Sequence, residues 1–439
     1  MRPDTLLEDT LRGWADEARV PHDLADRALR GRVRRRSLRA VLITGAGVAI
    51  ATVTAAAVVM STVPRLVTVA TLPRTAAPTS GMLITPGPTE AADTAVHTDT
   101  GNSPPRSFIA AGHVAVSAYY VDSLDKISDD RTHYRRTWYL YDPSSGTYKR
   151  TDWSMLDVAP GLKYAAVLER DLPARRVGIV DMATQRVVKW FDLGDHPVAG
   201  LAWSPDGTRL VATAYDQDPD IRDKKGFDSL GVHSRTGFHL VDVATGRTQF
   251  HAVAEKPVVV HLVEGRPGTF STQKGEHKRP FPRVTERPYP SQRHDFGWSD
   301  DGTLLWEHMV TDQNRRFLDL EGKEHAVPED WKRAVRSWQQ AGVSPNGRLY
   351  ADGGRPPGPQ TIVRKTATGK IVGVQGMEQL LAWADDDHLI GVRCAGECEN
   401  EFNNGLALVS LDGKSVTQLS ANRANTQRLG SWVPLLTRR

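Results

Sequence analysis

Five short turn motifs recur along this chain at nearly regular intervals. They are V-A-P-G at 158–161, W-S-P-D-G at 203–207, W-S-D-D-G at 298–302, V-S-P-N-G at 343–347 and W-A-D-D-D at 383–387. Each stands between two apolar runs, which is typical of a tight turn that joins two strands. Their third residues are 45, 95, 45 and 40 positions apart along the chain. A period in the forties, with about four strands per period, indicates the blades of a β-propeller.

A second set of turns alternates with the first along the chain. These turns contain Asp, Gly or Thr, and they occupy residues 141–146, 180–185, 241–246, 318–322, 365–369 and 410–413. Such residues suit the hairpin between the third and fourth strands of a blade.

The interval of 95 residues leaves the number of blades open. If residues 216–236 form a long loop, residues 254–296 provide about one further period, with possible strands at 258–263 and 269–273. We therefore expect an all-β propeller with seven four-stranded blades, and six blades with one large insertion is the alternative. The Pro, Lys and Arg residues of 275–293 count against the additional blade.

The turn motifs have a structural and a functional interpretation. A recurring Trp and a recurring acid could form a ring of binding residues, but packing between blades and turn geometry explain them better. The residues concerned are Pro160, Trp203, Pro205, Asp206, Gly207, Trp298, Asp301, Gly302, Pro345, Gly347, Trp383 and Asp385.

Composition restricts the folded core and the class of ligand. Apart from Trp14, every aromatic residue lies between Phe108 and Trp432, so only this part is expected to bury a large core. Residues 1–39 hold 10 of the 56 Lys or Arg residues and 7 of the 52 Asp or Glu residues. The net charge of the remaining chain is therefore close to zero. A nucleic-acid-binding domain would carry a basic stripe, so nucleic acid is not an expected partner.

The N-terminal quarter predicts a membrane anchor. Residues 40–63 are 24 uncharged residues, and a helix of this length, at about 1.5 Å per residue, spans a bilayer. Six Arg residues between 30 and 39 flank this segment, so its N-terminal side is expected in the cytoplasm and the propeller outside. Arg35-Arg36-Ser37-Leu38 loosely matches a twin-arginine export signal, and a cleaved signal is the alternative.

The flanking segments complete the predicted domain plan. Residues 1–39 form an Arg-rich arm with short helices, because Leu7, Leu11, Trp14 and Ala18 fall on one helical face. Residues 64–106 are rich in Thr, Pro and Ala, which predicts a disordered stalk. Residues 107–439 are then the extracytoplasmic propeller. The ring is expected to close by pairing 108–111 or 113–121 with 429–436, because an unclosed ring leaves exposed strand edges.

At W-S-P-D-G and its variants, the chain resembles the TolB-like and WD-repeat propellers. The resemblance covers roughly residues 108–432 and is strongest at 203–207 and 298–302. With the inner arm, one membrane helix and the stalk, the whole is similar to the membrane-anchored propeller proteins of actinobacteria. The resemblance implies a binding scaffold and transfers no catalytic residue.

The common sequence motifs of enzyme chemistry are absent from the chain. The sequence contains no G-x-S-x-G, H-E-x-x-H or P-loop motif, and its 14 His residues have no ligand spacing. No enzyme activity, cofactor or metal is therefore expected. Asp216, Asp218, Asp220 and Asp223 begin like a calcium loop, but Ile221 replaces the required Gly, so we interpret them as a solvated loop.

The two cysteines form an isolated pair. Cys394 and Cys398 are the only cysteines, and outside a membrane such a pair is expected to form a disulfide that pins the loop after 389–393. Free thiols or a metal site are the alternatives, although a zinc site would need two more ligands.

Together these features predict a single-pass membrane protein whose non-enzymatic propeller binds an extracytoplasmic protein, peptide or glycan. The alternative is a signal transducer resembling an anti-sigma factor, in which residues 1–36 dock a cytoplasmic protein. A propeller hydrolase is the third hypothesis, and it would need polar residues converging at one mouth of the ring.

Overall fold

The computed structural model describes residues 94–223, 234–253, 259–263, 284–288, 293–308, 315–337, 339–354, 361–398, 400–426 and 428–439. Within these ranges the regular elements are strands, together with two 3-10 helices, η1 (Glu329–Trp331) and η2 (Ala334–Arg336). None of the described helices is long and apolar enough to cross a bilayer. The predicted arm with its short helices (1–39), the membrane segment (40–63) and the first part of the stalk (64–93) lie outside the described residues.

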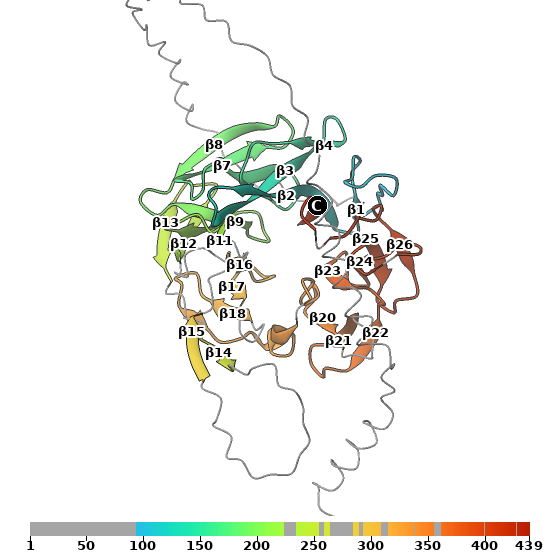
Figure 1. Ribbon diagram of the computed structural model, residues 1–439. Helices are drawn as coiled ribbons and strands as arrows, with labels where there is room; N and C mark the ends of the chain where they lie inside the picture. Colours follow the sequence, from blue (N-terminus) through green and yellow to red (C-terminus); the bar gives the residue numbers. More distant parts are fainter. Residues whose placement is uncertain are drawn as a thin grey trace, which may run out of the picture. The chain divides into compact units, whose positions relative to one another are not determined.

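Six of the seven antiparallel sheets in the described residues radiate from a common axis, which makes a six-bladed β-propeller (Figure 1). Blade 1 contains β27 (Trp432–Arg438), β2 (Val114–Lys126), β3 (Arg131–Asp142) and β4 (Thr147–Arg150), extended by β1 (Ala110–Ala111) and β11 (Ile221–Asp223). Blade 2 contains β5 (Met155–Val158), β6 (Tyr164–Leu168), β7 (Arg176–Asp181) and β8 (Arg186–Asp192). Blade 3 contains β9 (Val198–Trp203), β10 (Arg209–Tyr215), β12 (Arg235–Asp242) and β13 (Thr248–Ala252).

The remaining three blades follow in chain order. Blade 4 contains β16 (Gly297–Trp298), β17 (Leu305–His308), β18 (Arg315–Leu318) and β19 (Glu324–His325). Blade 5 contains β20 (Leu349–Gly353), β21 (Thr361–Lys365) and β22 (Ile371–Val374), and Val343 bridges Tyr350 in the place of an inner strand. Blade 6 contains β23 (Gln379–Trp383), β24 (His388–Arg393), β25 (Gly405–Ser410) and β26 (Val416–Gln418).

Hydrogen bonds within the turn explain why W-S-x-D-G recurs. In blade 3 the Ser204 hydroxyl accepts from the backbone N–H of Arg209 at 2.9 Å, and the Asp206 carboxylate accepts from the N–H of Thr208 at 3.0 Å. Gly207 has φ 69°, a left-handed conformation that suits Gly best. Blade 4 repeats these contacts with Ser299, Asp301 and Gly302. The Ser and Asp side chains therefore form their hydrogen bonds within the turn.

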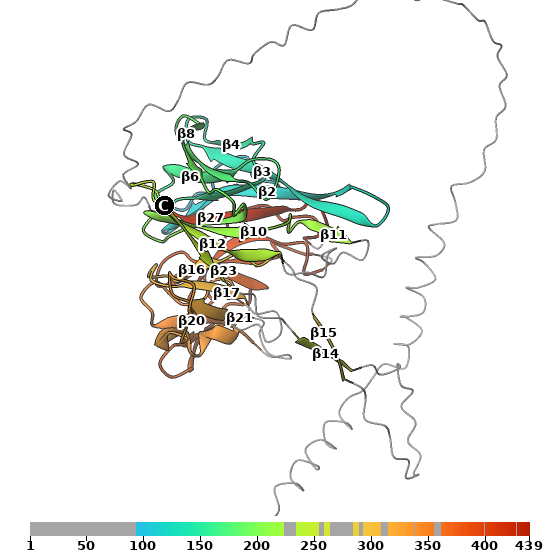
Figure 2. The same cartoon turned by 90° about the vertical axis from the view of Figure 1, so that its left-hand side faces the viewer.

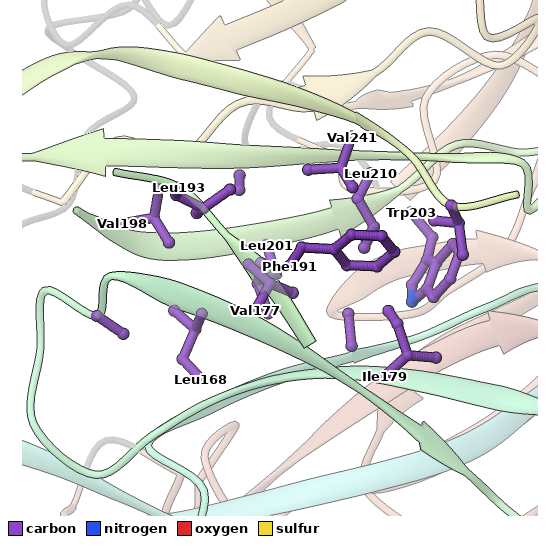
Figure 3. Close-up of a cluster of buried hydrophobic side chains, with 14 of the residues drawn as sticks. Leu168, Val177, Ile179, Phe191, Leu193, Val198, Leu201, Trp203, Leu210 and Val241 are labelled. Carbon is purple, nitrogen blue, oxygen red and sulfur yellow. The ribbon is translucent and has the colours of Figure 1, made fainter. Parts of the chain in front are cut away.

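The recurring Trp residues join neighbouring blades. The indole N–H of Trp203 donates to the carbonyl of Asp157 in blade 2 at 3.1 Å, and that of Trp298 donates to Ala202 in blade 3 at 2.9 Å. Trp383 makes the same contact with Gly342 at 3.4 Å. Figure 3 shows the Trp203 ring among the apolar side chains between blades 2 and 3, including Ile179, Phe191 and Leu210. These Trp residues therefore connect the inner strands and fill the core between blades.

Asp157 makes this junction sensitive to pH. Its Oδ2 accepts a hydrogen bond from the backbone N–H of Trp203 at 2.7 Å. Burial raises the pKa of Asp157 from 3.8 to about 6, although the N–H groups of Trp203 and Val158 lower it. Because the folded-state pKa is raised, deprotonation costs more in the folded state, and stability falls as the pH rises from about 4 to about 6.

We therefore expect Asp157→Asn to stabilise the propeller at neutral pH. The Asn oxygen still accepts from Trp203, while the charge is gone, so the free energy of unfolding should rise by about 1–2 kcal/mol at pH 7. Urea unfolding at several pH values measures this, and the difference should shrink toward pH 4. Asp386→Asn, in an exposed turn, is the control. A variant that is less stable than the parent at pH 7 would contradict the prediction.

The expectation of seven blades is wrong, because no blade separates blade 3 from blade 4. Residues 254–292 contribute only the hairpin of β14 (Val259–Val263) and β15 (Val284–Pro288) to the described structure, and these two strands pair with each other. The backbone N–H of Phe296 donates to Thr213 Oγ1 at 3.0 Å, so the chain entering blade 4 lies directly against blade 3. Phe296 and Trp298 also share one core cluster with Val211 and Phe238 of blade 3. Residues 254–292 are therefore an insertion.

The ring closes within blade 1, as the sequence predicts. The C-terminal strand β27 pairs with β2, from Val114 opposite Arg438 to Val121 opposite Trp432. Residues 94–106, which were assigned to the stalk, also pack against the propeller. Asp99, 6% exposed, accepts from the backbone N–H groups of Arg106 and Ser107 and donates its own N–H to Leu419 of blade 6. Residues 94–106 are therefore part of the folded propeller.

Candidate ligand-binding groove

The two faces of the propeller differ in their connections. Antiparallel pairing places the turns between first and second strands, and between third and fourth strands, on one face, which we call the turn face. The connections between second and third strands, and between blades, lie on the opposite loop face, and they include the long β10–β12 and β24–β25 connections. Strands β2 and β3 have 13 and 12 residues, and their hairpin projects beyond the other strands (Figure 2).

A strap from blade 3 crosses to blade 1 on the loop face. We call residues 216–223 the strap, because they lie in the β10–β12 connection and end in β11. Ile221, Arg222 and Asp223 pair with β3, opposite His133, Thr132 and Arg131. The backbone N–H of Tyr134 donates to the carbonyl of Asp220 at 2.9 Å. The strap therefore adds a strand to the projecting hairpin.

A buried charge network anchors the strap. Asp220 Oδ2 lies 2.7 Å from Arg136 Nη1 and 2.6 Å from Arg293 Nη1, and the Asp220 side chain is only 3% exposed. Burial would raise the pKa of Asp220, but the two guanidinium groups hold that pKa below its ordinary value. The same strap carries Asp218, whose Oδ2 lies 3.0 Å from His133 Nε2. Asp220 is therefore ionised and links blade 1 to the segment that enters blade 4.

Arg293 extends the network toward the axis. Its Nε lies 2.8 Å from Asp295 Oδ2, and the Tyr215 hydroxyl donates to Asp295 Oδ1 at 2.9 Å. Burial lowers the pKa of Arg293, but Asp295 and Asp220 outweigh burial and raise it. A Cβ on Gly200, in β9, would lie 2.3 Å from Asp295 Oδ1, so the inner strand needs Gly at this position. Each charge in this network therefore has an opposite partner, as a buried charge requires.

A groove opens beside this network, between blades 1 and 2. Its inner part has a volume of about 250 Å³, with Arg136 and Asp220 among its lining residues. The β2–β3 hairpin, the β4–β5 connection and the β6–β7 loop supply its walls. An outer part of about 960 Å³ continues along blade 2, and the two parts share Arg150, Thr151, Asp152, Trp153 and Arg170. A volume in this range accommodates a small ligand or a short chain segment.

The aromatic and charged groups of the groove are suited to binding. Trp153 is half-buried, and its ring meets Trp190 edge to face at 6.1 Å between centroids. Arg150 and Arg170 are exposed, and neither side chain has an ion pair or hydrogen bond with another described residue. Arg135, by contrast, pairs with Asp125 across the hairpin. The groove thus combines the paired charges of Arg136 and Asp220 with two available guanidinium groups.

The turn residues of the W-S-P-D-G motif and its variants do not line this groove. The markers Pro160, Pro205, Asp206, Pro345, Gly347 and Asp385 fall in the turns between first and second strands, on the turn face, with their neighbouring Gly and Trp residues. The Asp206 and Asp385 carboxylates bond within their own turns, and Asp385 accepts from the N–H of Asp387 at 2.8 Å. The structure therefore gives these residues a role in the architecture.

The acidic cluster differs from the expected solvated loop. Asp216 is exposed, but Asp220 is buried and Asp218 pairs with His133. Within the described ranges, no three His, Cys, Asp or Glu residues are placed to hold a metal ion. The carboxylates at 218 and 220 instead bind basic side chains of β3, which fixes the strap.

The structure joins Cys394 and Cys398 by a disulfide in the loop between β24 and β25. Their Cα atoms are 6.1 Å apart. The side-chain amide of Asn422 also binds this loop, because its Oδ1 accepts from the N–H of Ala395 and its Nδ2 donates to the Ala395 carbonyl, both at 3.0 Å. Two independent contacts therefore hold the loop.

We expect removal of both cysteines to have a small effect on stability. The disulfide closes a very short loop and Asn422 remains, so Cys394→Ala with Cys398→Ala should cost well below the usual ~2–4 kcal/mol. Thermal melting of parent and double variant measures the loss. Protein purified without reductant should show no free thiol until it is unfolded and reduced. Loss of folding in the double variant would contradict the expected minor role.

No sequence motif marks the groove. Arg150 ends β4, Trp153 lies in the β4–β5 connection and Arg170 lies in the β6–β7 loop, so the three residues form no motif. Arg293 lies within the stretch that was considered as part of an additional blade. The only usable signal was the aromatic and basic run Tyr134-Arg135-Arg136, which marks the long hairpin.

Comparison with known proteins supplies no function. No family model matches the chain, and no curated protein matches it in sequence. An oligogalacturonate lyase in complex with manganese is similar in structure, with 12% identity, a TM-score of 0.39, and coverage of 75% of this chain and 88% of that one. The oligogalacturonate lyase of Vibrio parahaemolyticus has 13% identity, a TM-score of 0.38, and coverage of 71% and 86%. A chain of the mitotic checkpoint complex has 14% identity, a TM-score of 0.35, and coverage of 70% and 86%. Similarity at this level transfers no activity or ligand.

Proposed function

We propose that this protein is a single-pass membrane protein that presents its propeller outside the membrane as a binding module without enzyme activity. Its ligand is a protein, peptide or glycan, and it binds in the groove between blades 1 and 2. The observation that supports this proposal is the combination of Trp153, Arg150 and Arg170, which are available to a ligand, over a floor of paired charges.

The chemistry of the groove floor favours recognition over catalysis. A general acid or base works best with a pKa near the operating pH. Asp220 is held ionised by Arg136 and Arg293, so it does not exchange protons near neutral pH. A carboxylate paired in this way can hold the neighbouring side chains of the groove in place, and it keeps its charge when a ligand binds.

The membrane part of the proposal rests on charge asymmetry in the sequence. Six Arg residues precede the uncharged segment 40–63, while only Arg65 and Arg74 follow it closely. A reporter that is active only outside the membrane should work when fused after Glu90, which precedes the described part of the propeller, and should fail when fused after Asp26. The opposite pattern would exclude the proposed orientation. A mature protein that begins beyond Val63 would show a cleaved signal instead.

Ligand selection tests the binding part of the proposal. The full chain in lipid nanodiscs would be screened against a random-peptide display library and a glycan array. Trp153→Ala should weaken binding of the selected ligands by roughly tenfold or more, because it removes the aromatic wall of the groove. Arg247→Gln, an exposed substitution in the β12–β13 turn, should leave binding unchanged. Binding that is insensitive to Trp153→Ala would place the ligand site elsewhere.

A further inference from the structure

The two free guanidinium groups of the groove indicate what its ligand contains. Four Arg residues line the inner part, and two of them, Arg135 and Arg136, already bind Asp125 and Asp220. Arg150 and Arg170 make no such contact with any described residue, although they line both parts of the groove. An Arg side chain presents a planar set of donors that matches a carboxylate, and a concave, partly desolvated site strengthens that attraction.

The acidic residues of the same groove limit the ligand further. Asp152 and Asp171 are exposed in the outer part, and neither carboxylate has an ion pair with a described residue. A polymer with a negative charge on every unit would meet these carboxylates and be repelled. A chain in which an acidic group is flanked by neutral or basic units would satisfy both signs of charge.

Trp153 adds an apolar contact between the charged groups. Its ring is fixed edge to face against Trp190, and the Arg176 guanidinium lies 4.2 Å from the centre of the Trp190 ring. A ring held in this way loses little entropy when a ligand packs against it. The side chain of a peptide residue next to the acidic one can occupy this position.

We propose that the groove binds an extended peptide segment through isolated Asp or Glu residues. The ligand carboxylates bind Arg150 and Arg170, and neighbouring residues of the peptide lie along Trp153 and the outer part of the groove. This inference rests on the proposed function and names its ligand class. Because the contact is ionic and partly exposed, binding should weaken as the salt concentration rises.

The peptides selected on the full chain in nanodiscs provide the test. They should be enriched in single Asp or Glu residues, and replacing that residue by Asn or Gln should weaken binding about 10- to 100-fold, as for a lost charged hydrogen bond. Arg150→Gln and Arg170→Gln should each weaken binding of the acidic peptide similarly and should not affect the Asn or Gln peptide. Arg247→Gln is the matched control, and thermal melting checks that each variant is folded.

Other outcomes separate this inference from the proposed function. Peptides that depend on Trp153 but not on Arg150 or Arg170 would overturn the acidic ligand and leave the binding groove in place. Exclusive binding of glycans, or of a uniformly charged oligoglutamate, would overturn the proposed peptide class. If no ligand depends on any residue of the groove, both proposals fail.

Discussion

Removal of residues 430–439 is expected to abolish cooperative folding of the whole propeller. These residues include β27, which pairs with β2 along seven positions and forms the inner strand of blade 1. Trp432, only 2% exposed, belongs to the core that joins blade 1 to blade 6. Its loss alone should cost about 3–5 kcal/mol. Because domains are typically stable by only about 5–15 kcal/mol, loss of the complete strand should exceed the stability available.

Thermal melting and protease resistance of the full chain and the truncated chain measure this effect. Leu429→Ala is a suitable control, because Leu429 precedes the strand and is 48% exposed. This change should alter stability by no more than about 0.5 kcal/mol. Trp432→Ala, which keeps the strand, should be intermediate. An unchanged melting transition after truncation would mean that pairing between β27 and β2 is dispensable.

Asp220→Ala is expected to destabilise the protein by about 3–5 kcal/mol, because it leaves two buried guanidinium groups without their shared carboxylate. Arg136 and Arg293 approach this carboxylate from blade 1 and from the segment that enters blade 4. Both contacts also fix the strap beneath the groove. We therefore expect weaker ligand binding as well as lower stability. Chemical unfolding measures the free-energy loss, and protease cleavage within 216–223 reports release of the strap.

Two comparisons make the second prediction specific. Asp129→Ala removes an exposed ion pair with Lys126 and should cost no more than about 1 kcal/mol. Adding Arg136→Met to Asp220→Ala should recover part of the loss, because Arg293 keeps Asp295 and the change removes the guanidinium group that has lost its acidic partner. Equal stability of Asp220→Ala and Asp129→Ala would show that the network does not hold the strap.

The repeated turns were predictable because their chemistry is local. Ser204, Asp206 and Gly207 bond within a few residues of one another, so their pattern is visible along the chain. The hairpins between third and fourth strands follow the same logic, and all six predicted positions fall between the strands expected. The closing of the ring followed from a general requirement, because an unpaired inner edge would be unstable.

The number of blades was not predictable in the same way. The segment 254–296 has the length and some of the apolar residues of a blade. Whether it forms one depends on the contact between Phe296 and Thr213, which brings blade 4 directly against blade 3. A contact between residues 83 positions apart leaves no periodic trace in the sequence.

The groove depended even more on tertiary structure. In the sequence, nothing distinguishes Arg150 and Arg170 from Arg135 and Arg136. Only the fold shows that Arg135 and Arg136 are already paired with acidic residues. The sequence predicts a solvated Asp220 because its basic partners, Arg136 and Arg293, lie 84 and 73 residues away along the chain.

Short-range patterns and the need to pair every inner strand therefore specify the propeller class, the turn geometry and the joining of the two ends. The six blades, the crossing of residues 216–223 to blade 1, and the groove with two unpaired guanidinium groups between blades 1 and 2 become apparent only in the folded protein. Those features depend on which distant side chains meet and neutralise one another. Ion pairing and packing between blades select such partners through space, and the linear pattern does not record them.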